Sequence, residues 1–259
     1  MEIPRKIFQT WKAKTIQNNI LRSWQFSWKL YNPSYEYIIW DDTDNRNFIK
    51  ENFSDFLETY DSYDMNIKRV DAIRYFYLLK FGGIYADLDF ECLKSFDNII
   101  ESGELAGKNI LLGTLGQMDN EKYQLHKIPN ALMISKPGED FWKLIIQVMK
   151  GIDLEIRNSL PPELITGPCL LGICYDFYMN RKPSNLKFII DTYKKNIFEG
   201  VNINFSSLIG ILPPDLIYPI NWDKAEHYKY NKKFLTHNEA LEMFPNSYAV
   251  TYWMHSWSK

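Results

Sequence analysis

Residues 71–91 read D-A-I-R-Y-F-Y-L-L-K-F-G-G-I-Y-A-D-L-D-F-E, and the predicted fold is built around this segment. Apolar residues recur at three- and four-residue steps in and just before its first half, as on one face of a helix. These residues are Ile67, Val70, Ile73, Tyr77 and Phe81. Asp71 and Arg74 stand three residues apart, where helical side chains can meet. Gly82-Gly83 favours an abrupt helix end, because paired glycines supply left-handed backbone.

The second half of this segment predicts a buried strand that carries two acidic residues. The segment 84–90 is short and mainly apolar, and within it Asp87 and Asp89 flank Leu88. Side chains alternate along a strand, so both carboxylates should face one side while Leu88 faces the core. They could be exposed turn aspartates or a partner for Arg74. They could instead bind a hard divalent cation such as Mg²⁺ or Mn²⁺, which prefers oxygen ligands.

The surroundings of the two aspartates favour the metal interpretation. A D-x-D alone is common by chance, but here it follows an amphipathic helix with D-x-x-R, a Gly-Gly pair and Tyr85. Two carboxylates at the end of a buried strand are also unfavourable unless something compensates their charge.

This combination resembles the core motif of glycosyltransferase family 32, which includes fungal initiating mannosyltransferases and bacterial capsule enzymes; more distantly it is similar to glucosylating clostridial toxins. The resemblance implies a GT-A-type α/β fold with a mixed, mostly parallel sheet flanked by helices. It further implies that Asp71 and Arg74 contact the donor sugar, with Tyr85 in the same donor site. Asp87 and Asp89 would hold Mn²⁺, or Mg²⁺, on the nucleotide diphosphate.

The N-terminal segment I-P-R-K-I-F-Q-T-W, residues 3–11, predicts a first strand. Similar family members usually have a histidine where this chain has Phe8, so any role of that histidine is lost. Trp11 matches the position at which the related toxins stack a tryptophan on the nucleotide base. A tryptophan packed in the core at a strand end is the alternative.

Two later segments also resemble the family. Residues 130–135 read N-A-L-M-I-S and predict a strand, in which Asn130 matches an amide that contacts the donor sugar, although a structural asparagine is the alternative. Thr166-Gly167-Pro168 predicts a turn before a helix that runs to about residue 180. This helix start either presents backbone N–H groups to an anion or is a plain helix entry.

The C-terminal residues 248–259 read Y-A-V-T-Y-W-M-H-S-W-S-K. By resemblance His255 is a third metal ligand and Trp257 a donor-binding residue, although the family's H-x-x-x-S-W spacing is compressed here to H-S-W. We expect the remaining histidines, His126, His227 and His237, to lie on the surface.

Composition narrows the class of protein. With 259 residues and 46% hydrophobic content, the chain can form one domain, residues 1–259. Its nucleotide-binding half should span about residues 1–115 and its acceptor side about residues 116–259. A net charge of −2 argues against nucleic-acid binding, and three sparse cysteines argue against a disulfide framework or zinc site. No apolar run reaches the ~18 residues of a membrane span, so we expect a cytoplasmic protein. Any association with the membrane would be peripheral, at its inner face.

The sequence therefore predicts a retaining, metal-dependent hexosyltransferase. Its donor would be a nucleoside-diphosphate sugar, a UDP-sugar in preference to GDP-mannose. Its acceptor would be a saccharide, a lipid-linked saccharide or a glycolipid, in capsular or other cell-surface glycan synthesis. The alternatives are a catalytically inactive relative that binds sugar or nucleotide, and a phosphatase of the haloacid-dehalogenase type. The latter is disfavoured because Glu91 stands where that motif needs Thr or Val.

Overall fold

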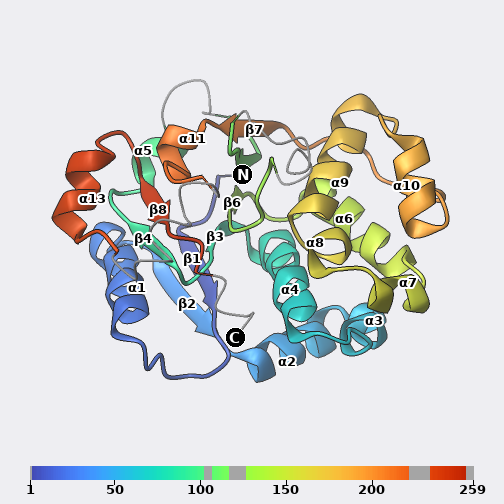
Figure 1. Cartoon of the computed structure of the whole chain (residues 1–259), viewed down its shortest axis with the longest axis horizontal. Helices are drawn as coiled ribbons and strands as arrows, with labels where there is room; N and C mark the ends of the chain where they lie inside the picture. The colour runs from blue at the N-terminus through green and yellow to red at the C-terminus, as the bar shows by residue number, and fades with distance from the viewer. Residues whose placement is uncertain (1, 102–106, 117–126, 222–233, 255–259) are drawn as a thin grey trace.

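A six-stranded sheet forms the centre of the protein in the computed structural model, which describes residues 2–101, 107–116, 127–221 and 234–254 (Figure 1). The strand order is β2-β1-β3-β6-β5-β7. β6 runs antiparallel to both of its neighbours, and the other neighbouring strands run parallel. The predicted mixed, mostly parallel sheet is confirmed. Its strands are β1 (Lys6–Thr10), β2 (Glu36–Trp40), β3 (Gly83–Ala86), β5 (Ile110–Gly113), β6 (Leu132–Ser135) and β7 (Ile209–Leu212).

Helices cover both faces of this sheet, and successive residues of one strand enter opposite cores. On β3, Tyr85 packs into one core cluster and its neighbours Ile84 and Ala86 into the other. The first cluster is built with helices α2 (Asp42–Asn52), η1 (Ser54–Phe56), α3 (Leu57–Asp61), α4 (Asn66–Phe81), α6 (Asp140–Gly151), α8 (Pro162–Ile165), α9 (Pro168–Asn180) and α10 (Leu186–Tyr193). The second is built with α1 (Asn19–Tyr31), α5 (Asp97–Glu101), α11 (Pro214–Ile217) and α13 (His237–Met243). α7 (Leu154–Ser159) follows α6.

A second, two-stranded sheet pairs β4 (Phe90–Cys92) with β8 (Ala249–Thr251) in antiparallel register. Phe90 faces Thr251 in this register. The pairing brings the end of the described chain beside the D-x-D segment. None of the helices in the described ranges is long and apolar enough to cross a bilayer.

The prediction of one continuous strand over residues 84–90 is wrong, because the strand ends earlier. β3 ends at Ala86, and Asp87, Leu88 and Asp89 form a turn that leads into β4. Asp87 N still donates to Ala131 O at 2.8 Å, and Phe90 N then donates back to Asp87 O at 3.1 Å. The chain turns here because β4 leaves the large sheet to pair with β8. Leu88 is buried, as predicted, at 4% exposure.

The paired glycines end helix α4 as predicted. Gly82 and Gly83 have φ values of 64° and 91°, the left-handed region that side chains other than glycine rarely adopt. A Cβ on Gly83 would lie 2.6 Å from Lys6 O, so glycine is also needed for β3 to approach β1. The glycine pair therefore carries the chain directly from helix α4, which holds Asp71 and Arg74, into strand β3.

Candidate active site

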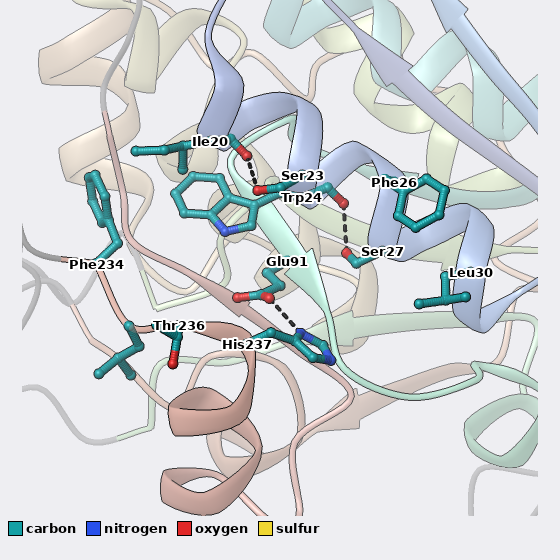
Figure 2. A pocket seen from close by; sticks show the side chains of 11 residues that line it. Ile20, Ser23, Trp24, Phe26, Ser27, Leu30, Glu91, Phe234, Thr236 and His237 are labelled. Atoms are coloured by element: carbon teal, nitrogen blue, oxygen red, sulfur yellow. Dashed lines mark hydrogen bonds and ion pairs between the residues drawn. The ribbon is translucent and has the colours of Figure 1, made fainter.

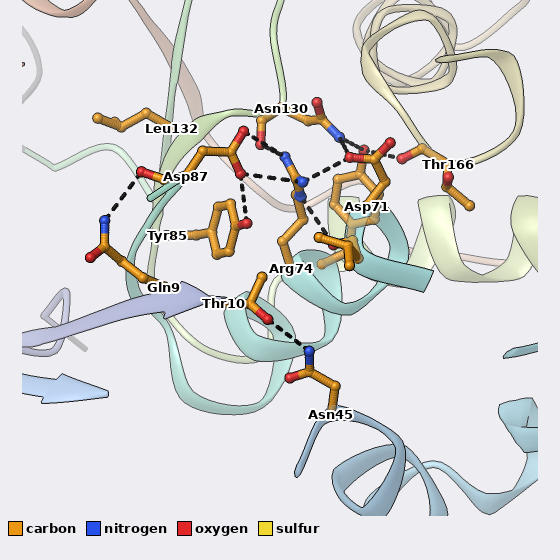
Figure 3. A network of polar contacts seen from close by, with 12 residues as sticks. Gln9, Thr10, Asn45, Asp71, Arg74, Tyr85, Asp87, Asn130, Leu132 and Thr166 are labelled. Atoms are coloured by element: carbon orange, nitrogen blue, oxygen red, sulfur yellow. Dashed lines mark hydrogen bonds and ion pairs between the residues drawn. The ribbon is translucent and has the colours of Figure 1, made fainter. Parts of the chain in front are cut away.

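The guanidinium of Arg74 is the centre of a buried polar cluster at the end of β3 (Figure 3). Arg74 is 2% exposed, and its Nη2 lies 2.7 Å from Asp71 Oδ1 and 3.3 Å from Asp87 Oδ1. Its Nη1 donates to the main-chain oxygen of Asn130 at 2.8 Å. The pairing of Asp71 with Arg74 expected from their spacing is confirmed, and both aspartates share one cation.

Asp87 is fixed from three sides. Tyr85 donates its hydroxyl to Asp87 Oδ1 at 2.7 Å, and Gln9 Nε2 donates to Asp87 O at 3.1 Å. The guanidinium of Arg74 stacks over the Tyr85 ring at 4.7 Å from its centroid. Asp87 is thus a partner of Arg74, one of the alternatives that the sequence left open, in a conformation that its neighbours determine.

The cluster contains more negative than positive charge. Burial raises the pKa of Asp71 to about 6 although Arg74 opposes the shift, and burial together with the nearby Asp87 raises the pKa of Asp89 to about 6. Burial also raises the pKa of Asp87. Three carboxylates around one guanidinium would leave two excess negative charges when all are ionised. A divalent cation would neutralise that excess, so these residues fit a metal site.

Asp89 receives one hydrogen bond from the far end of the chain. Met254 N donates to its Oδ2 at 2.9 Å. The residues predicted to complete this side of the site, His255 and Trp257, lie outside the described residues. Among residues that the structure describes, no three His, Cys, Asp or Glu side chains gather as a metal site. The described part of the predicted metal site is therefore Asp87 and Asp89.

Asn130 and Tyr75 form a second layer behind Asp71. Asn130 Nδ2 lies 3.2 Å from Asp71 Oδ1 and 3.3 Å from the Tyr75 hydroxyl, which donates to Thr166 O at 2.8 Å. Asn130 therefore orients Asp71, and its contact with the donor sugar stays a prediction. The sequence analysis missed Tyr75 because a tyrosine next to Arg74 on a buried helix is equally typical of a core residue.

The T-G-P turn also reaches this cluster. Gly167 precedes α9 as its N-cap, and a Cβ there would lie 2.8 Å from Glu163 Cα and 3.2 Å from Asp71 Oδ2. The turn thus begins a helix, as predicted, and it also packs against a predicted donor-binding carboxylate. Presentation of its backbone N–H groups to an anion stays a prediction. Only glycine fits between α8 and Asp71.

The two N-terminal aromatic residues differ in position. Phe8 is buried and stacks on Tyr77 and Phe81, with ring centroids 5.2 and 5.6 Å apart. It therefore belongs to the core. Trp11 is half-buried at the edge of the other core cluster, and Lys12 Nζ lies 5.4 Å from its ring centroid. Base stacking by Trp11 stays a prediction.

His237 is partly exposed, with a side-chain exposure of 34%, but it is not a free surface residue, because it has two polar partners. Its Nδ1 lies 2.6 Å from Glu91 Oε1, and its Nε2 lies 2.7 Å from the Tyr31 hydroxyl. This occurs because α13 folds back beside α1 and β4, which nothing local in the sequence indicates. His126 and His227 lie outside the described residues.

Comparison with known proteins identifies the segment that carries this cluster. The family model described as "Glycosyltransferase sugar-binding region containing DXD motif" matches residues 20–105, which include Asp71, Arg74, Asp87 and Asp89. Over these residues the chain belongs to the D-x-D glycosyltransferase family. The resemblance expected from the sequence is confirmed.

Relatives of this D-x-D chain include two proteins of Schizosaccharomyces pombe. Inositol phosphoceramide mannosyltransferase 2 is 32% identical over 70% of this chain and 49% of the relative. Inositol phosphoceramide mannosyltransferase 3 is 44% identical over 67% of this chain and 45% of the relative. The chain thus spans about half the length of these relatives. Among solved structures, PaToxG glycosyltransferase is similar, with a TM-score of 0.45 and 14% identity over 76% of this chain and 75% of that one.

Proposed function

We propose that this chain is a retaining, metal-dependent hexosyltransferase of GT-A type, which uses a nucleoside-diphosphate sugar as donor. The observation that carries the proposal is the buried Asp71–Arg74 pair together with the partly buried Asp87 and Asp89 at the end of β3. Such a group has too little positive charge of its own, and it suits a ligand that brings a cation. The D-x-D family supports a transferase over the phosphatase alternative.

Each residue of the group would have a distinct role. Asp71 and Arg74 would hold the donor sugar, with Asn130 keeping the Asp71 carboxylate in place. Asp87 and Asp89 would hold Mn²⁺ or Mg²⁺, which supplies Lewis-acid neutralisation of the leaving diphosphate. Arg74 is a fixed, buried cation beside Asp87, so it would stabilise the same developing charge without reorganising. Trp11 would stack on the base.

The names of the relatives favour mannose as the transferred sugar and a glycolipid as the acceptor. Both S. pombe proteins are named for mannosyl transfer to inositol phosphoceramide. GDP-mannose is therefore a second candidate donor beside the UDP-sugar expected from the sequence. An acceptor with a lipid part would bring the chain to a membrane surface. We therefore propose a role in glycolipid synthesis at a membrane, in preference to a role in capsule synthesis.

Ligand-induced stabilisation separates the donor classes. We would measure the melting temperature with Mn²⁺ plus UDP, Mn²⁺ plus GDP and each component alone. A ligand at about 100 times its dissociation constant adds about 2.7 kcal/mol, which is readily detected. Transfer from the matching sugar nucleotide to a glycolipid acceptor would then be assayed with Mn²⁺ and with chelator. Stabilisation by neither nucleotide would favour the catalytically inactive relative.

The variant Asp89→Asn tests the metal assignment. It keeps the shape of the side chain and an acceptor for Met254 N, but it removes the negative charge. We expect it to fold and to lose metal-dependent transfer. Asp55→Asn is the matched control, because Asp55 is exposed and forms a surface ion pair with Lys150. Full activity of Asp89→Asn would refute the assignment of Asp89 as a ligand.

A further inference from the structure

A pocket lies between helix α1 and the segment that leads into α13, beside strand β4 (Figure 2). Its volume is about 580 Å³, within the ~300–1,000 Å³ typical of small-molecule sites. Its apolar wall residues are Ile20, Trp24, Phe26, Leu30, Phe234 and Leu235. No lysine or arginine lines the described part of this pocket. The pocket therefore suits an apolar body.

One acidic side chain interrupts this apolar lining. Glu91 lines the pocket and is 4% exposed. Its Oε1 is paired with His237 Nδ1 at 2.6 Å, but its Oε2 is buried and has no hydrogen-bond partner among the described residues. A buried carboxylate oxygen without a donor is unfavourable and uncommon in proteins. Glu91 Oε2 is thus an acceptor that a ligand could satisfy.

Four polar side chains of the lining have other partners and cannot supply that donor. The Trp24 indole N–H also lies in the lining, on the side of Glu91 (Figure 2). His237 uses its second nitrogen, Nε2, with the Tyr31 hydroxyl at 2.7 Å. Ser23 and Ser27 donate to main-chain oxygens one turn earlier on α1, at 2.7 and 2.6 Å. Thr236 bonds within its own capping box. A group that enters the pocket could therefore supply the donor that Glu91 Oε2 lacks among the described residues.

We propose that this pocket binds an amphiphile, an alkyl chain that carries an O–H or N–H donor. The donor would bond to Glu91 Oε2, and the chain would lie against Trp24 and Phe234 (Figure 2). The apolar surface continues outward along α1, where Phe26 and Leu30 line the pocket and are 61% and 57% exposed. Such an extension gives the chain a path out of the pocket.

This site is separate from the proposed transferase centre. Neither the donor-sugar pair Asp71 and Arg74 nor the proposed metal ligands Asp87 and Asp89 line the pocket. The proposal does not depend on sugar transfer, so failure of either proposal leaves the other intact.

Three probes of similar chain length test the chemistry of the ligand. We would titrate the full chain with octylammonium, 1-octanol and octyl methyl ether by isothermal calorimetry, below the concentrations at which they aggregate. The first two carry a donor, and the ether carries none. We expect one or both donors to bind at least tenfold more tightly than the ether. Tighter binding of octylammonium would identify an amine ligand, and tighter binding of octanol a hydroxyl ligand.

Two variants place the binding in the pocket. Ser23→Phe would fill the pocket from its exposed rim, and Ser159→Phe is the matched control. Both serines are exposed and donate only to a main-chain oxygen three residues earlier on their helices. Binding should be lost in the first and unchanged in the second. The variant Glu91→Gln should weaken binding of the donor-bearing probes at least tenfold. If this variant does not fold, the loss of binding in Ser23→Phe tests whether the probes occupy the pocket.

Other results would overturn the proposal. Equal affinities for the ether, octanol and octylammonium would show that Glu91 does not favour ligands with a hydrogen-bond donor. Binding that survives Ser23→Phe would place the ligand elsewhere. Absence of binding together with concentration-dependent dimerisation in size-exclusion chromatography, abolished by Phe26→Ser, would assign this face of α1 to a second copy of the chain.

Discussion

Arg74 Nη2 lies 2.7 Å from Asp71 Oδ1 on the preceding turn of α4, and both side chains are buried. The same nitrogen lies 3.3 Å from Asp87 Oδ1, so one guanidinium joins the helix to the D-x-D turn. Each carboxylate therefore depends on Arg74 for its charge balance, and the site is a single electrostatic unit.

Arg74→Met should destabilise the fold strongly. Removing one partner of a buried ion pair typically costs about 3–5 kcal/mol, because the remaining charges stay buried. Arg46→Met is the control, since Arg46 pairs with Asp61 on the surface, where such pairs contribute about 0–1 kcal/mol. The free energies of unfolding in urea give both values. Equal losses would mean that Arg74 does not balance the buried acids.

Asp71→Asn should change how stability depends on pH. The folded-state pKa of Asp71 is raised to about 6 from 3.8, chiefly by burial, so the folded state binds its proton more tightly than the unfolded state. The stability that this group contributes is present below pH 3.8 and is lost as the pH rises to about 6. The variant should therefore gain stability relative to the natural chain between about pH 4 and about pH 6, as measured by urea unfolding.

Asp140→Asn is the control for this pH effect. Burial acts to raise the pKa of Asp140, but hydrogen bonds from Ser206 and Lys143 outweigh it, and the pKa is lowered from 3.8. Its contribution is lost only as the pH falls below that value. The stability difference between this variant and the natural chain should be constant across the same window. A slope equal to that of Asp71→Asn would contradict the burial of charge at Asp71.

Gly167→Ala should impair transfer more than folding. The new methyl group would meet Glu163 Cα and approach Asp71 Oδ2, so the T-G-P turn or the carboxylate must shift. Misplacement of a positioning group by about 1 Å can cost roughly 100-fold in rate, and we expect at least a tenfold loss in kcat/KM. Gly151→Ala should have no effect, because a Cβ there meets nothing within 4 Å. Steady-state kinetics with thermal melts of both variants would show the difference.

Trp11→Ala should weaken nucleotide binding. Loss of one aromatic stacking partner typically costs about 1–3 kcal/mol per base, and Trp11→Phe should retain most of it. Calorimetric titration with the stabilising nucleotide and Mn²⁺ measures both variants. If Trp11→Ala binds nucleotide normally but melts at a lower temperature, Trp11 is a core residue, the alternative that its sequence position leaves open.

Local spacing was sufficient to predict one part of this architecture. The existence of helix α4, its glycine end and the Asp71–Arg74 pair follow from local spacing, which a helix converts directly into contacts. The single apolar stripe expected for this helix is wrong, because residues 71–78 are all buried. The break after Ala86 could not be predicted in this way. Leu88 is buried both in a strand and in the observed turn, so its apolar character does not distinguish them.

The contacts that could not be predicted from the sequence join segments that are distant along the chain. Gln9 reaches Asp87 O because β1 lies beside β3, and His237 reaches Glu91 because α13 packs near α1. No spacing along the chain encodes such neighbours. They become predictable only when the strand order is known, and here β6 enters between β3 and β5.

The pairing of β4 with β8 has a consequence for the order in which the protein is built. Asp89 takes its hydrogen bond from Met254, 165 residues further along the chain. Closing a loop of that length carries an entropic cost and slows folding. During synthesis, the acidic turn would emerge early and reach its final conformation only after residues 249–254 have left the ribosome. A nascent chain that already contains the whole D-x-D segment is therefore still without a finished centre.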